Sequence, residues 1–131
     1  GATLNVDSTN YANVDNGTDI ALSPNTVGSP AENYIFTIGN TNIVRFSGQG
    51  ATKTFVGSSV TLRTQSINTA ATTDITVQGQ NSGLVQTITV SVKADAASTT
   101  DPLQKQQRNL ESPEAGAPTG VITGPGGSIS Y

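Results

Sequence analysis

The chain has 131 residues, the length of one domain, and only 11% of them are charged, against about 25% in an average globular protein. Lys and Arg together number 6, too few for the charged faces of surface helices, so a helical bundle is excluded. The basic residues are scattered and the net charge is −3, which argues against nucleic acid as a partner. The sequence also has no run of about 18 apolar residues, so we expect no membrane partner.

Histidine and cysteine are both absent from the sequence. Their absence excludes Ser-His-Asp and Cys-His catalysis, disulfides and the commonest zinc ligands. The acidic residues among the first 80 residues stand beside Asn, Gly, Ser or Thr, as turn-forming acids do; they are Asp7, Asp15, Asp19, Glu32 and Asp74. We therefore expect a protein that is not an enzyme and needs no cofactor.

Short β-rich runs alternate with turn-forming clusters from the start of the chain to residue 93, at the spacing of a sandwich or barrel. We predict strands over residues 3–6, 20–22, 33–38, 42–46, 53–56, 59–64, 74–80 and 85–93. Residues 7–30 are unusually polar and show no clear strand rhythm. Within this segment, Asp15, Asn16 and Asp19 offer some of the oxygen ligands of a calcium-binding loop, but further acidic positions and a distal Glu are missing. An Asx turn is therefore the preferred interpretation of residues 15–19.

The strongest signal is a hairpin over residues 74–94. Apolar residues alternate with polar ones on both sides of a Gly79-Gln80-Asn81-Ser82-Gly83 turn, whose residues tolerate positive φ. The pattern predicts one continuous inward row made of Ile75, Val77, Ile88, Val90 and Val92. Such a row contributes about 1.5 to 3 kcal/mol of burial free energy per side chain, which compensates for the small number of aromatic residues.

Residues 54–94 resemble the closing strands of bacterial-type immunoglobulin-like repeats. The resemblance is carried by Gly57-Ser58-Ser59-Val60-Thr61-Leu62 and by a TVxxxxxGLxQTxTVxV ending. Such domains occur in surface adhesins, secreted enzymes and bacteriophage virion proteins. The resemblance implies an all-β, immunoglobulin-like antiparallel sandwich, over residues 1–94, with an adhesive or architectural use.

The aromatic residues fall into two groups. Tyr34, Phe36, Phe46 and Phe55 occupy strand positions, so we interpret them as core residues rather than as a carbohydrate-binding platform. Tyr11 and Tyr131 lie in irregular segments and are the candidates for exposed docking residues.

Residues 95–131 have a different composition and are predicted to form a long C-terminal arm. Asp101-Pro102 is a favourable helix start, and a short helix is expected over residues 102–111. Frequent Gly and Pro beyond it prevent long regular structure. We expect the arm to bind a neighbouring subunit, the alternative being that it folds back on its own sandwich. The candidate partner-binding residues are Leu103, Leu110, Val121, Ile122, Ile129 and Tyr131.

These features favour a structural protein of a bacteriophage virion, such as a capsid decoration (cement) protein or a head or tail accessory subunit. The start at Gly1 is expected to result from removal of an initiator methionine, without a leader. Partners would be other protein subunits, in a homo-oligomer or a larger assembly. The alternatives are a bacterial or archaeal cell-surface filament or adhesin module, located outside the cell, and a carbohydrate-binding accessory domain.

Overall fold

A computed structural model of the protein describes residues 1–95, which are all-β, with no helix among them. The strands are β1 (Thr3–Asn5), β2 (Asn10–Val14), β3 (Asp19–Leu22), β4 (Asn25–Val27), β5 (Tyr34–Ile38), β6 (Val44–Phe46), β7 (Thr54–Gly57), β8 (Val60–Thr64), β9 (Ala71–Gly79) and β10 (Val85–Val92). The predicted arm, its helix over residues 102–111 and its six candidate binding residues lie outside the described residues. No helix in residues 1–95 could cross a membrane.

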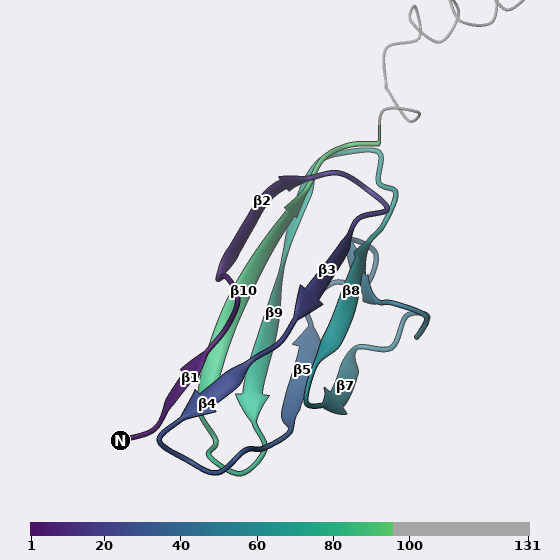
Figure 1. The fold of residues 1–131 in the computed structure, drawn as a ribbon. Coiled ribbons are helices and arrows are strands. Elements are labelled where there is room, and N and C mark those ends of the chain that lie inside the picture. Colours follow the sequence, from purple (N-terminus) through teal and green to yellow (C-terminus); the bar gives the residue numbers. More distant parts are fainter. Residues whose placement is uncertain (96–131) are drawn as a thin grey trace, which may run out of the picture. The chain divides into compact units, whose positions relative to one another are not determined.

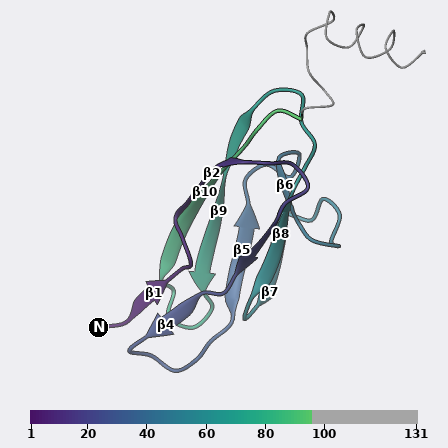
Figure 2. The same cartoon turned by 45° about the horizontal axis from the view of Figure 1, so that its top comes forward.

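The strands form a β-sandwich-like arrangement of sheets (Figure 1). A five-stranded sheet has the order β2-β10-β9-β5-β7, and a three-stranded sheet has the order β3-β8-β6. A small two-stranded sheet pairs β1 with β4. The turned view in Figure 2 shows β10, β9 and β5 side by side in the larger sheet. All pairings are antiparallel except that of β2 with β10, which is parallel.

The core lies between the two larger sheets. It consists mainly of the side chains that point inward on strands in which buried and exposed residues alternate. The predicted row of the β9–β10 hairpin is fully buried, and the hairpin itself is confirmed. The other buried apolar side chains come from both layers, from β1 and from the turn before β6; they are Leu4, Ile20, Leu22, Tyr34, Phe36, Ile38, Ile43, Val44, Phe46 and Leu62. Phe55 is half-buried and packs against Phe36 and Phe46, with ring centroids 6.4 and 5.7 Å away. The interpretation of the four aromatic strand residues as core is confirmed.

Two strands in the polar segment of residues 7–30 were not predicted, β2 and β4. β2 carries a bulge, since three residue steps on β2, from Tyr11 to Val14, match two on β10, from Val90 to Val92. Asn13 supplies the bulge with a φ of 54°, which Asn adopts more readily than most residues. The bulge interrupts the alternation of side chains by which a strand is recognised.

Tyr11 was expected to be exposed, and this expectation is wrong. It is half-buried on β2 and packs against the core. Burial raises the pKa of its phenol, and the nearby charge of Asp7 raises it further. Because the residues around Tyr11 are polar, the sequence did not indicate β2, the strand on which the Tyr11 ring covers part of the core.

Three threonines are buried among the apolar residues, and each uses its hydroxyl group to hold a neighbouring segment. The Thr64 hydroxyl donates to the Asp15 carbonyl (2.6 Å) and accepts the Thr18 N–H (2.9 Å), which fixes the loop before β3. The Thr73 hydroxyl accepts the Asn40 N–H at 2.8 Å, which fixes the loop after β5. Thr26, the third, lies beside the pocket described below. Because a buried hydroxyl without a partner is costly, these bonds account for the polar residues in the core.

Candidate functional site

The outer side of the five-stranded sheet carries two rows of side chains that cross four strands. The pairing registers of β7, β5, β9 and β10 place the members of each row side by side, about 4.8 Å apart. We call these rows the neutral face; the first is Val56, Ile35, Gln78 and Val85, and the second is Thr54, Thr37, Thr76 and Thr87. Neither row contains a charged residue.

The neutral face is apolar at both ends of its first row. Val56 is 50% exposed and Val85 is 55% exposed, so both valines present methyl groups to solvent. The second row consists of threonines, whose side chains each carry one methyl and one hydroxyl group. The face therefore offers apolar contacts together with hydroxyl groups that both donate and accept hydrogen bonds.

The edge of this sheet is open beside the neutral face. Within residues 1–95, β7 pairs only with β5, so no described strand covers its other side. An unpaired edge presents N–H and C=O groups to which a further strand can be added.

The outer side of the three-stranded sheet is different and carries ions. Asp19, Arg63 and Arg45 are neighbours across β3, β8 and β6, and we call this row the charged face. Arg63 Nη1 lies 2.9 Å from Asp19 Oδ1, and Arg45 Nε donates to the Thr41 carbonyl at 2.8 Å. These three side chains are held by partners within the domain.

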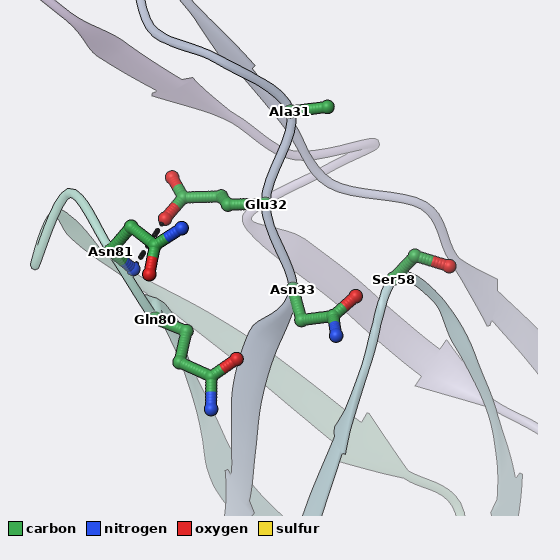
Figure 3. A pocket seen from close by; sticks show the side chains of 6 residues that line it. All are labelled: Ala31, Glu32, Asn33, Ser58, Gln80 and Asn81. Atoms are coloured by element: carbon green, nitrogen blue, oxygen red, sulfur yellow. Dashed lines mark hydrogen bonds between the residues drawn. The ribbon is translucent and has the colours of Figure 1, made fainter.

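A polar pocket of about 370 Å³ lies at one end of the sandwich, where the β4–β5 loop, the β7–β8 turn and the β9–β10 turn meet (Figure 3). It is open to solvent. We call it the carboxamide pocket; it is lined by Ala31, Glu32, Asn33, Ser58, Gln80 and Asn81.

Glu32 joins two of these segments through its carboxylate. Oε1 accepts the backbone N–H groups of Asn81 (2.8 Å) and Ser82 (2.9 Å). Oε2 accepts the hydroxyl groups of Thr26 (2.7 Å) and Ser82 (2.8 Å). The Thr26 hydroxyl group also lies 2.8 Å from the Tyr34 hydroxyl group, so the network continues into the core. Each carboxylate oxygen thus has two hydrogen-bond partners.

These bonds favour the ionised form of Glu32. The Ser82 N–H has the largest effect, followed by the Thr26 hydroxyl, and together the donors lower the pKa of Glu32 to about 2. Partial burial opposes this shift, but its effect is smaller than the sum of the hydrogen bonds. The carboxylate is therefore charged and fixed in place at neutral pH.

Gly79 allows this close approach. A Cβ atom at residue 79 would lie 2.6 Å from Glu32 Oε2 and 2.3 Å from the Ser82 hydroxyl oxygen, so any larger residue would displace the network. The sequence interpretation assigned this glycine to a positive-φ turn position. In the structure only Gly83 of this turn has a positive φ, at 75°, and Gly79 is needed for space.

The remaining polar side chains of the pocket have no partners among the described residues. Within residues 1–95, no hydrogen bond involves the side chains of Asn33, Ser58, Gln80 or Asn81. The Gln80 N–H donates to the Asn33 carbonyl at 2.9 Å, so the backbones that carry two of these carboxamides are tied together. Figure 3 shows Asn33 at the entry to β5 and Gln80 and Asn81 on the β9–β10 turn, all three lining the pocket.

The other acidic residues each have a structural partner. Asp15 pairs with Lys93 at 2.8 Å, and Asp7 accepts the backbone N–H of Ser23 at 2.8 Å. Asp74 accepts the Thr89 hydroxyl at 3.1 Å. Across residues 1–95 there is no group of three or more residues that could hold a metal ion.

Comparison with known proteins gives no family for this chain. It matches no protein-family model and has no significant similarity to a curated protein. The site is therefore interpreted from its own geometry.

Proposed function

We propose that the protein is a non-enzymatic structural subunit that binds neighbouring protein subunits of a larger assembly. The observation that carries this proposal is the neutral face, whose two rows cross four strands and contain no charged residue; the adjoining row of β9 and β10 contains Asp74, which accepts the Thr89 hydroxyl. Binding a protein surface to such a face removes water from methyl groups and does not require the desolvation of an ion. A partner surface of matching chemistry is one that is also neutral and rich in β-branched side chains.

We further propose an immunoglobulin-like sandwich for residues 1–94. In immunoglobulin-like domains the second, fifth and fourth strands form one sheet, and the third, sixth and seventh form the other. The orders β3-β8-β6 and β5-β9-β10 support this assignment. One connection departs from it, because β6 precedes β7 along the chain although β7 is the strand that extends the sheet of β5.

A non-enzymatic role is supported by how the acidic residues are used. General acid–base and nucleophilic catalysis require a titratable group that is free to reach a substrate. Glu32 is held by four hydrogen bonds, and Asp15 and Asp19 pair with basic residues. Asp7 and Asp74 accept hydrogen bonds from Ser23 and Thr89. These acidic residues of the described domain are thus committed to architecture.

We propose a bacteriophage virion as this assembly, with the protein as a capsid decoration or head–tail accessory subunit. The sandwich would lie on the lattice through its neutral face, while the arm residues proposed from the sequence would contact an adjacent subunit. Two weak contacts on one chain raise each other's effective concentration. A bacterial or archaeal cell-surface filament would use the same two contacts, and the open edge of β7 would then accept a strand of the next subunit.

The test is to follow the protein in cells that carry its gene in the native context. An antibody against the chain is used to locate it after gradient fractionation of the lysate and the medium. We expect it to sediment with particles or filaments, and cross-linking mass spectrometry should identify a repeated structural protein as its partner. Recovery of the chain only as a free monomer would contradict the proposal.

A further inference from the structure

We infer that the carboxamide pocket is a binding site for a neutral saccharide, a function distinct from the proposed docking through the neutral face. The pocket collects three carboxamides and a hydroxyl group, from Asn33, Gln80, Asn81 and Ser58. Each carboxamide has both donor and acceptor groups, and so does each sugar hydroxyl. A sugar ring that carries several hydroxyl groups can therefore bond to the donors and the acceptors of these carboxamides at the same time.

The charges at the pocket favour a neutral ligand. The only ionised side chain in the lining is Glu32, and each of its oxygens already accepts two hydrogen bonds from the protein. A cation would have to break these bonds to be coordinated. An anion would approach a fixed carboxylate with no basic residue in the lining to compensate for the repulsion.

The pocket is organised before any ligand arrives. Glu32 fixes the backbone of Asn81, and the hydrogen bond from the Gln80 N–H to the Asn33 carbonyl joins the two segments that carry the carboxamides. A site whose backbone is already ordered loses less conformational entropy on binding. The methyl group of Ala31 adds a small apolar surface against which the C–H side of a sugar ring can pack.

The size and openness of the pocket set the expected affinity. Its volume of about 370 Å³ lies at the lower end of the range for small-molecule sites. One terminal sugar unit fits this space, and the lining contains no aromatic ring to stack on it. We therefore expect millimolar binding to a single site, strengthened by avidity when many copies are displayed together.

A peptide is the main competing ligand, because carboxamides also bind peptide groups. Peptides are usually bound along a strand edge, where backbone groups repeat at regular intervals. The groups of this pocket converge instead from three separate connections between strands, which suits a compact ligand.

The test is a nuclear magnetic resonance titration of the isotope-labelled full chain with free monosaccharides at millimolar concentrations. The panel contains glucose, galactose, mannose and N-acetylglucosamine, and an uncharged blocked tripeptide serves as the competing probe. We expect at least one sugar to shift the amide signals of residues 31–33, 58 and 80–82 in a saturable manner. The N33A/Q80A double variant should lose this response, and Gln49→Ala, which removes an exposed carboxamide elsewhere, should keep it.

Two results would overturn the inference. One is the absence of a saturable shift at these residues with every sugar, including the case in which only the tripeptide binds. The other is a sugar response that survives in the N33A/Q80A variant while its spectrum remains that of a folded protein. Neither result bears on the docking proposal, because the pocket variants leave the neutral face unchanged.

Discussion

The two outer faces of this sandwich are built by the same kind of strand but carry opposite chemistry. The three-stranded sheet presents Asp19, Arg63 and Arg45 in one row, whereas the five-stranded sheet presents two rows without a charge. Charged side chains keep a surface hydrated, since their burial against a partner requires the removal of tightly held water. The difference supports our proposal that the neutral face, and not the charged face, is the docking surface.

The interior shows no such difference between the two sheets. The inner sides of the two sheets interlock through one apolar core. A change on an inward position should therefore destroy both faces, while a change on an outward position should alter only one.

The largest effect is expected from Val90→Asp. Val90 is completely buried in the middle of β10, and an aspartate there would be an unpaired charge in an apolar environment. We expect loss of at least about 4 kcal/mol of unfolding free energy, enough to unfold many small domains. Circular dichroism during heating measures this. Thr87→Asp, at an outward position on the same strand, should remain folded, and an unchanged melting temperature for Val90→Asp would show that the strand register is wrong.

An intermediate effect, dependent on pH, is expected from Glu32→Gln. The pKa of Glu32 is lowered from 4.5 to about 2 in the folded protein. A lowered pKa means that the carboxylate stabilises the fold fully above about pH 4.5 and that this contribution is lost as the pH falls towards 2. The variant should melt at a lower temperature than the wild type at neutral pH, and the gap should close in acid. The other acidic residues are common to both proteins, so a gap that is independent of pH would contradict the hydrogen-bond network.

The smallest effect is expected from Arg63→Ala, which weakens the charged face. The ion pair with Asp19 is short at 2.9 Å, but the two side chains are 50% and 59% exposed. Exposed pairs of this kind contribute about 0 to 1 kcal/mol. Urea unfolding should therefore give nearly the same midpoint as the wild type, and Lys93→Ala, which removes a similar pair with Asp15, serves as the matched variant. A loss well above 1 kcal/mol would mean that the charged face has a structural role.

The sequence was sufficient to predict the strands whose burial alternates regularly. The β9–β10 hairpin is the clearest example, because each apolar residue in it is followed by a polar one and the turn is short. The predicted start of β6 is less accurate, because the prediction included Asn42 and Ile43, which lie in a turn before Val44. β4 was missed because its inward residue is Thr26, a polar side chain whose burial depends on Glu32 and Tyr34.

The surface features could not be predicted because they depend on contacts between distant segments. Glu32 is bonded to Ser82, 50 residues away, and no local pattern around either residue indicates this pairing. The neutral face requires the registers of four strands, of which only the hairpin register follows from the sequence. The assignment of acidic residues to turns is wrong for Asp19 and Asp74, which lie within β3 and β9. Glu32 lies in a loop as predicted, but the turn that it holds is the β9–β10 turn and not its own.

The measurement that tests the central claim most directly compares one lysine on each face. Gln78→Lys places a charge between Ile35 and Val85 in the neutral face, and Ala21→Lys places one on the exposed outer side of the three-stranded sheet. Both variants should fold like the wild type, and each is mixed with the particles or filaments isolated from cells that lack the gene. We predict that Gln78→Lys loses binding by tenfold or more in co-sedimentation, because an unpaired ion must be desolvated, while Ala21→Lys binds as the wild type does. Equal binding by both variants, or selective loss with Ala21→Lys, would contradict the assignment of the neutral face as the docking surface.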